Sequence, residues 1–343
     1  MSNVKTESMP DVVNAVVNEA NISGVPTATM TNFPEVGAVL SQPSIANSFW
    51  SVLMNKVAMT IVRSKLWNNP LAPLKKGSVP YGEIIEEIAM NPADVKDYET
   101  DADTQLAVVK ADIKSAYHGL THKKFTCVSM NRAKVKMAFQ SPEKFAEVLT
   151  SNINTLYSGK NIYEYETMRD TLQFAVRNGH IVKQTMAAPS NTQESADAFV
   201  EKLRGLALAF SMPSTSFNKY IDMTGAVGQA YKTWTDIEDL YVLLPNAILS
   251  KIDVYALSKA FNVEYEKFIG HVIGVDSLGT DAEQSGKNIN AVICDKALLQ
   301  VYEYENTNTE FFNPRTLDYK YYYHFWDGFD ISPFANAVAL VEA

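Results

Sequence analysis

Apolar side chains recur at helical spacing in the middle of the chain, most clearly over residues 142–178. Ser141 is a suitable N-cap and Pro142 fits the first helical position. One apolar face then runs through Phe145, Val148, Leu149, Ile153, Leu156, Tyr157, Tyr165, Met168, Leu172 and Val176. Asn178–Gly179 indicates the C-terminal cap. Because Ser158–Gly159 interrupts the pattern, the segment predicts either one long helix with a kink or two helices in line.

Shorter helices are predicted on either side. Residues 44–66 carry apolar side chains at helix-compatible steps, and Asn69–Pro70 stops the pattern. Asn191 and Glu194 have the spacing of a capping box, ahead of a helix that Met212–Pro213 closes. A third helix is expected over residues 254–261, with Asp253 as its cap. Residues 1–40, by contrast, are polar with poor periodicity, so we expect an extended arm, with a frayed terminus as the alternative.

Strand patterns dominate the C-terminal half of the chain. Leu240–Leu244 is a continuous apolar run of the kind found in buried strands. Further strands are expected at residues 271–275, 291–294, 301–304, 319–326 and 335–341. The chain therefore predicts a mixed fold of helices and strands.

Residues 74–126 have a different pattern, which predicts a long β-hairpin. A strand over residues 79–88 follows the turn signal at Lys75–Gly77, and apolar side chains between residues 106 and 117 indicate a returning strand. Residues 94–103 between them are acidic and almost free of apolar side chains, as in a solvated tip. A two-stranded hairpin cannot bury a core of its own. We therefore expect it to need a partner surface, which indicates assembly.

The composition excludes several classes of protein. A chain of 343 residues that is 46% hydrophobic and 20% charged can bury a large core. Its net charge of −9 argues against a protein that binds nucleic acid through a basic face. Residues 1–20 lack the apolar core of a signal peptide, and no apolar run approaches the ~20 residues of a membrane helix. We therefore expect a protein that is made and used in a cytoplasm.

No catalytic or ligand-binding motif accompanies these patterns. The sequence has no GxxxxGK[ST] or GxGxxG nucleotide loop and no G-x-S-x-G elbow. His118 and His122 are four residues apart in a strand-like context without a third ligand, so we expect surface histidines. Cys127 and Cys294 lack the surroundings of activated thiolates. Calcium is not expected at the alternating acids either, because these do not fit an EF-hand loop: Asp97, Glu99, Asp101 and Asp103. We predict no enzyme activity, cofactor or metal.

The most unusual composition lies in residues 319–326, where aromatic side chains follow one another almost without interruption. Such a run can form a stacking platform for bases. It can also be a sheet strand with aromatic side chains on both faces, one packed on a core and the other on a neighbour. The acidic charge and the lack of interleaved arginine favour the core or interface strand.

Three segments, in a fixed order and spacing, carry a resemblance to a known family. They are Asn68–Gly82 running into Ile84–Ile88, then Asn313–Leu317 leading to Tyr321–His324, and finally Phe334–Ala339. Together they resemble the major capsid proteins of tailed bacteriophages, most closely those of the small short-tailed podoviruses of Gram-positive hosts (the Salasmavirus group). No single segment is a chemical motif, so the resemblance rests on their joint occurrence over nearly the whole chain.

The resemblance implies an α+β fold of the Hong Kong 97 capsid type. In its terms, residues 1–66 are the N-terminal arm and its helix, and residues 67–126 are the extended loop, a β-hairpin that lies across a neighbouring subunit. Residues 127–184 are the peripheral domain with its long spine helix, residues 185–310 the axial domain, and residues 311–343 the strands that return to the peripheral domain. The predicted hairpin, long helix and later α/β part agree with this order.

The resemblance also implies a structural function: self-assembly as hexamers and pentamers into the icosahedral head that encloses a phage's double-stranded DNA. The implied partners are further copies of the chain, a separate scaffolding protein and a portal or connector at one vertex. DNA is enclosed without sequence-specific binding, and no membrane is involved. The expected place is the virion capsid, after assembly in the host cytoplasm.

Charged side chains of the hairpin region are the candidates for contacts between subunits: Lys75, Lys76, Asp94, Asp97, Glu99, Asp101 and Asp103. Single surface ion pairs are weak, so only their number would matter. Two alternative functions stay open at this point. One is an encapsulin-type compartment shell with the same fold, and the other is a soluble enzyme whose pocket the sequence does not reveal.

Overall fold

The computed structural model describes residues 8–42, 45–46, 48–49, 52–53, 67–79, 84–95, 108, 111–131, 141–225, 230–255, 270–281, 286–316 and 318–342. The chain forms two compact units. Unit 1 comprises Met1–Asn69, Lys123–Glu164 and Glu305–Trp326, and unit 2 comprises Pro70–His122, Tyr165–Tyr304 and Asp327–Ala343. Helix α6 (Pro142–Arg177) and strands β10 (Leu299–Asn313) and β11 (Asp318–Ile331) contribute residues to both units.

Unit 1 buries one face of its sheet against helices. The sheet has the strand order β1-β10-β11-β4. Strand β4 (His122–Asn131) lies almost wholly in unit 1, whereas β1 (Gly77–Ser78) and the residues of β10 with which it pairs, Tyr302 and Glu303, belong to unit 2. Helices α1 (Met9–Glu19) and α2 (Phe33–Leu40) and the first part of α6 share one hydrophobic core with β11. Alternate residues of β11, namely Tyr321, Tyr323 and Phe325, point into this core. The core face of the predicted aromatic strand is thereby confirmed.

The expectation of an extended N-terminal arm is wrong for the described residues. Helix α1 begins at a cap in which the amide and hydroxyl of Ser8 donate to Asp11 Oδ2 at 3.0 and 2.6 Å. Its side chains Val13, Val16 and Val17 are buried in the core of unit 1. A short helix of this kind is stabilised by tertiary packing more than by propensity, so its composition alone gave a weak signal.

Helix α6 is a single helix of 36 residues, so of the two alternatives for this segment the one long helix is confirmed. Its interior Gly159 serves close packing: a Cβ there would lie 3.1 Å from Cγ2 of Thr126 on β4. The predicted cap after the helix is also confirmed, since Gly179 has a left-handed φ of 73°. Of the predicted helix at 44–66, residues 45–46, 48–49 and 52–53 are helical, and residues 54–66 lie outside the described part.

Unit 2 is built on a six-stranded sheet with the order β5-β12-β9-β6-β7, in which β8 also pairs with β9. The strands are β5 (Val182–Thr185), β6 (Leu240–Pro245), β7 (His271–Val275), β8 (Thr280–Asp281), β9 (Lys287–Asp295) and β12 (Ala337–Val341). All five residues of β12 are buried. The strands predicted in these segments are confirmed, together with those inside β10 and β11.

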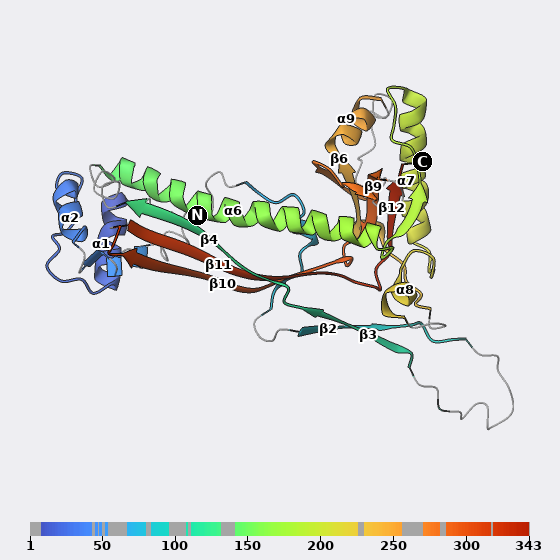
Figure 1. The fold of residues 1–343 in the computed structure, drawn as a ribbon, viewed down its shortest axis with the longest axis horizontal. Coiled ribbons are helices and arrows are strands. Elements are labelled where there is room, and N and C mark those ends of the chain that lie inside the picture. Colours follow the sequence, from blue (N-terminus) through green and yellow to red (C-terminus); the bar gives the residue numbers. More distant parts are fainter. Residues whose placement is uncertain are drawn as a thin grey trace, which may run out of the picture. The chain divides into compact units, whose positions relative to one another are not determined.

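Both faces of this sheet are covered, which explains its continuous apolar runs. Leu240, Val242 and Leu244 pack with helices α7 (Gln193–Phe210) and α9 (Asn246–Tyr255). The alternate residues Tyr241 and Leu243 belong to a second cluster that includes the later part of α6. Figure 1 shows α7 and α9 beside strands β6, β9 and β12. The short elements η1 (Ala72–Leu74), α8 (Tyr220–Thr224) and η2 (Ile237–Asp239) also belong to the unit.

Two predicted helix starts in unit 2 are wrong. Helix α7 has Thr192 as its N-cap and no side-chain cap bond, so Asn191 and Glu194 do not form the expected capping box. Helix α9 begins directly after β6 at Asn246, well before the expected start at residue 254. Residues 256–261 of that prediction lie outside the described residues. None of the helices in the described ranges has the length and apolarity that a bilayer crossing requires.

Strands β2 (Ile84–Met90) and β3 (Ile113–Gly119) pair antiparallel and form the two-stranded sheet of unit 2 (Figure 1). The register places Ile84 opposite Gly119 and Met90 opposite Ile113. The predicted hairpin is therefore confirmed in its two strands. Its acidic tip falls mostly on residues 96–107, which lie outside the described part of the chain.

Candidate assembly surface

The β2–β3 hairpin has two unlike faces, because successive side chains of a strand point to opposite sides. Its outer face consists of Ile84, Glu86, Ile88, Met90, Ile113, Ser115 and Tyr117, all of which are exposed. The apolar side chains among them are 56–71% exposed, although each is large enough to be a core residue elsewhere. Neighbouring residues of this kind mark an interaction surface more often than a solvated one.

Cross-strand contacts shape the outer face. Ile88 lies opposite Ser115, and Glu86 opposite Tyr117, whose hydroxyl donates to Glu86 Oε1 at 3.1 Å. The register thus places Glu86 in the middle of an apolar strip. A partner for this face needs apolar side chains and a positive group opposite Glu86.

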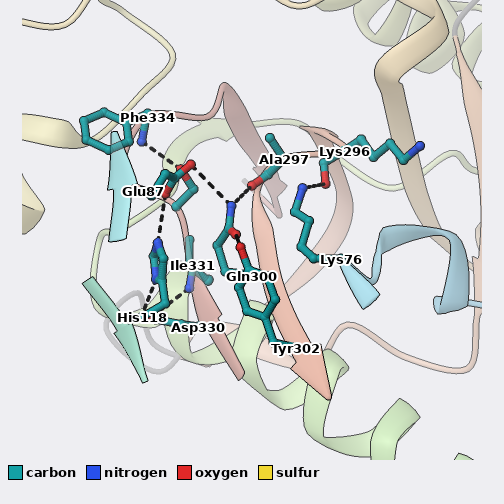
Figure 2. A network of polar contacts seen from close by, with 11 residues as sticks. Lys76, Glu87, His118, Lys296, Ala297, Gln300, Tyr302, Asp330, Ile331 and Phe334 are labelled. Carbon is teal, nitrogen blue, oxygen red and sulfur yellow. Dashed lines mark hydrogen bonds and ion pairs between the residues drawn. The ribbon is translucent and has the colours of Figure 1, made fainter. Parts of the chain in front are cut away.

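The inner face of the hairpin, made of Ile85, Glu87, Ala89, Lys114, Ala116 and His118, is partly or fully buried in unit 2. Figure 2 shows His118 between the carboxylates of Glu87 and Asp330. Its Nε2 lies 2.8 Å from Glu87 Oε2 and its Nδ1 lies 2.8 Å from Asp330 Oδ2. The His118 side chain is only 3% exposed. The expectation of a surface histidine is therefore wrong for His118, because strand pairing turns it inward.

Glu87 is held by further donors at the base of the hairpin. Ser332 Oγ donates to Glu87 Oε1 at 2.9 Å, and Gln300 Nε2 approaches the same oxygen at 3.3 Å. The hydroxyl of Tyr302 in turn donates to Gln300 Oε1 at 2.6 Å (Figure 2). The carboxylate of Glu87 therefore connects β2 to β10 and to the residues after β11.

Two carboxylates decide the charge of His118. Burial disfavours the imidazolium and by itself lowers the pKa, but the hydrogen bonds to Asp330 and Glu87 and their negative charges outweigh burial and raise the pKa of His118 to about 9. At neutral pH the ring is therefore protonated and donates from both nitrogens.

A second set of contacts holds the hairpin further along its strands. The Asn91 amide donates to Asp112 Oδ2 at 2.7 Å and to the Ala230 carbonyl at 2.9 Å, and its oxygen accepts from the Lys232 amide at 2.8 Å. Lys114 is buried, pairs with Asp112 at 3.1 Å and lies over the ring of Tyr220 at 5.2 Å. The hairpin strands are thus fixed to unit 2 by their polar inner face, while their apolar outer face is left open.

The charged residues predicted to contact other subunits have different surroundings. Lys75 forms an ion pair of 2.6 Å with Glu303 of the same chain. Lys76 Nζ donates to the Lys296 carbonyl at 3.1 Å, and burial lowers the pKa of Lys76. Asp94 is exposed. The remaining acids lie outside the described residues: Asp97, Glu99, Asp101 and Asp103. The role of these residues between subunits stays a prediction.

Unit 1 presents a second exposed apolar surface on its sheet, which we call the aromatic face: Phe125 on β4, Phe311 on β10, and Tyr322, His324 and Trp326 on β11. Phe125 contacts the rings of Tyr322 and His324 at centroid distances of 5.6 and 5.8 Å. Lys123 Nζ lies 4.7 Å from the centroid of Trp326. Phe125 and Phe311 are more than half exposed. The face is largely aromatic, and Lys123 lies at its margin.

Among the described residues no group of three His, Cys, Asp or Glu side chains is placed to hold a metal ion. Cys294 is fully buried, and burial raises the pKa of its thiol. Cys127 is exposed on β4. Sequence reasoning named His118 but missed Glu87 and Asp330. The alternation of β2 and β3 places Glu87 on the same face as His118 once their register is known, whereas Asp330 on β11 has no signal near His118 in the sequence.

Comparisons with known proteins agree on one family. A family model described as the Phi29-like phage major capsid protein matches residues 11–341. The major capsid protein of Bacillus phage PZA is 30% identical over 345 residues, covering 98% of this chain and 73% of the relative. The major capsid protein of Streptococcus phage Cp-1 is 26% identical over 307 residues, covering 85% of this chain and 81% of the relative.

Solved structures show the fold. A capsid structure of Staphylococcus phage Andhra matches with a TM-score of 0.64 and 16% identity, covering 82% of this chain and 86% of that chain. The mature capsid of bacteriophage PhiM1 matches with a TM-score of 0.51 and 10% identity, covering 82% of this chain and 89% of that chain. The α+β fold of the Hong Kong 97 capsid type, which the sequence resemblance implied, is confirmed. With a family model matched over almost its whole length, the chain belongs to the Phi29-like phage major capsid proteins.

Proposed function

We propose that this major capsid protein builds the phage head from hexamers and pentamers through its β2–β3 hairpin, which binds a neighbouring copy. One observation carries the proposal: the hairpin's inner face is fixed to its own chain, while its outer face exposes five large apolar side chains, those of Ile84, Ile88, Met90, Ile113 and Tyr117. Burying such a side chain contributes about 1.5–3 kcal/mol. Every subunit of a shell exposes this face, so each needs a binding partner for it. Another copy of the chain is available at every such position.

We infer that the receiving surface is the aromatic face of the neighbouring copy. The two surfaces can pack on each other, since each is one face of a β-sheet and sheets pack face to face. They are also complementary in charge: the outer face carries Glu86, and the aromatic face is bordered by Lys123. One face of the aromatic strand was predicted to pack on a neighbour. In this pairing, that face packs on the hairpin of another copy.

A crosslinking experiment tests this pairing. Cys127 is exposed on β4, two residues from Phe125, and Cys294 is buried, so the chain offers one reactive thiol beside the aromatic face. Cysteines introduced singly at Ile84, Ile88, Ile113 and Tyr117 are expected to join to Cys127 of another copy when shells are treated with an oxidant or a short bis-maleimide. Because every copy both gives and receives a hairpin, denaturing gels should show a ladder that closes at rings of five and six.

Ala89→Cys is the matched control, since residue 89 lies next to Ile88 but on the inner face. It is expected to give no ladder, and neither is any outer-face variant that also carries Cys127→Ser. If none of the four outer-face variants crosslinks in intact shells, the aromatic face is not the receptor. If the ladder appears but ends at a different ring size, the pairing stands and the hexamer–pentamer arrangement is wrong.

The charged residues near the hairpin are proposed as additional contacts between copies, and Lys75 provides the sharpest test. Its pair with Glu303 is partly exposed and is worth at most about 1 kcal/mol. Lys75→Glu should lower the free energy of unfolding of the unassembled chain by about this amount, and adding Glu303→Lys should restore it. If the swap restores both stability and shell yield, Lys75 has no role between subunits. Restored stability with a lasting loss of shells supports the proposed contact.

The remaining partners follow from the same function. We propose that a separate scaffolding protein guides assembly in the host cytoplasm, that a portal or connector occupies one vertex, and that the shell encloses double-stranded DNA without reading its sequence. The net charge of −9 supports the last point, because an acidic wall does not retain DNA. The function is structural and non-catalytic, and the family match favours neither an encapsulin-type compartment nor a soluble enzyme.

In these terms we assign the parts of the chain as the family resemblance suggests. Residues 1–66 are the N-terminal arm and its helix, 67–126 the extended loop, 127–184 the peripheral domain with α6 as spine helix, 185–310 the axial domain, and 311–343 the return strands. The confirmed hairpin and the single helix α6 support the assignment.

A further inference from the structure

We propose that Glu87, His118 and Asp330 form a proton-dependent latch, which holds the base of the hairpin in the position for binding a neighbouring copy and opens when His118 loses its proton. The proposal rests on the proposed function of the hairpin. It starts from the geometry of Figure 2, where one imidazole bridges two carboxylates from separate strands, β2 and β11. The test below separates the latch from the assembly role.

The three side chains are built into the contact between the hairpin and the body of unit 2. His118 lies on the inner face of β3, and Asp330 lies on β11. The backbones approach closely beside them: a Cβ on Gly328 would lie 2.7 Å from the carbonyl oxygen of Gly119. Only glycine fits there, so β11 is brought near enough for Asp330 to reach the imidazole.

Charge makes this contact sensitive to protonation. An imidazolium donates to both carboxylates, whereas a neutral imidazole has a single N–H and must leave one carboxylate without its donor. Asp330 then faces Glu87 across a neutral ring, and two negative charges in a partly buried place repel each other. Loss of one proton therefore removes a bridge and creates a repulsion at the same point.

The other charged and titratable groups near the latch do not replace the proton of His118. Glu87 accepts from Ser332 and from Gln300, which are neutral donors. Lys76, Tyr231 and Tyr302 interact electrostatically with Glu87. Burial raises the pKa of both tyrosines, which keeps them neutral across the range in which His118 titrates. Lys76 donates to the Lys296 carbonyl and not to either carboxylate of the latch, so the bridge between Glu87 and Asp330 depends on the charge of His118.

The direction of the effect follows from the raised pKa. A histidine with a pKa of about 9 in the folded chain, against 6.5 for an unperturbed imidazole, stabilises the contact fully below pH 6.5 and loses this contribution as the pH rises through 9. The contact should be closed at neutral pH and open at pH 10. Further along the hairpin, the strands are held by hydrogen bonds of the Asn91 amide, a group that does not titrate.

Hydrogen exchange on the full, unassembled chain tests the latch. Amide protection, corrected for the intrinsic pH dependence of exchange, should fall at least about tenfold in residues 84–87 and 116–119 between pH 7 and pH 10, because a charge-assisted bridge is lost. The midpoint should lie near pH 9. Peptides from β6, β9 and β12 should keep their protection and serve as the internal reference.

Variants separate the charge from the packing. His118→Gln keeps a neutral donor of similar length and should show the low protection already at pH 7, with no further step up to pH 10. Asp330→Asn removes one partner and should move the midpoint to lower pH. A wild-type hairpin whose protection shows no step, or a His118→Gln variant that keeps the wild-type profile, would overturn the latch.

Shell assembly, followed by light scattering on the same samples, tests the link to the proposed function. Assembly of the wild type should fall with the same midpoint as hairpin protection, and His118→Gln should assemble poorly at pH 7. If protection steps but assembly does not, the latch exists as a local contact and its proposed role in positioning the hairpin is overturned. In that case the crosslinking ladder still decides separately whether the hairpin binds a neighbouring copy.

Discussion

Replacing Ile84 and Ile88 together by aspartate is expected to abolish shell formation while leaving the folded subunit intact. Both side chains are more than half exposed in the single chain, so the change removes little from its own core. In the proposed contact, each buried isoleucine contributes about 1.5–3 kcal/mol, and a carboxylate buried in its place adds a desolvation cost. The loss of about 3–6 kcal/mol in every contact is larger than a reversible assembly tolerates.

The measurement combines light scattering and negative-stain microscopy with thermal unfolding of the purified subunit. Ile84→Leu with Ile88→Leu is the matched control, because it keeps the apolar surface at the same two positions, and it is expected to form shells. Shells of the aspartate variant at wild-type yield would show that the outer face of the hairpin takes no part in assembly. A drop in melting temperature of the aspartate variant alone would point to damage within the subunit.

Phe199→Ala is expected to cause the largest loss of stability within unit 2, about 3–5 kcal/mol, which is the usual cost of removing a buried phenylalanine. The ring is fully buried on α7, in the cluster that joins this helix to the sheet strands through residues such as Val242 and Ile293. The sheet cannot collapse around the cavity, because both of its faces are packed.

Denaturant unfolding of the unassembled chain, followed by circular dichroism, measures the effect. Leu208→Ala is the matched control on the same helix: Leu208 is 52% exposed, and its loss should change the free energy of unfolding by less than about 0.5 kcal/mol. Equal losses for the two variants would contradict the assignment of the α7 face that packs on the sheet.

Elements with a strong local pattern were predictable. The long helix α6 has its cap signals and its apolar face in one continuous stretch, and the hairpin strands are separated by an acidic segment that no core accepts. The aromatic strand and its core face were also foreseen, while the packing of its other face on a neighbour stays a prediction. Each of these features follows from the local spacing of apolar and polar residues, which is why it could be predicted from the sequence.

Features that depend on long-range pairing were not predictable. The helix at Met9–Glu19 is short and owes its stability to the core it joins, so its local signal was weak. His118 was predicted to be a surface residue, because no residue near it in the sequence indicates a contact with Asp330. That residue is 212 positions away in the sequence. For the same reason the pair between Lys75 and Glu303 was invisible, and Lys75 was assigned only to contacts between subunits.

By itself, the sequence determined that this chain has a long helix, a thin hairpin in need of a partner and a buried mixed sheet, because these follow from local periodicity and composition. The tertiary structure alone decided which side of the hairpin is open and which is fastened. That choice depends on the register of β2 with β3 and on the approach of β11 at Gly328, which turn Glu87 and His118 inward and leave Ile84 and Ile88 outside.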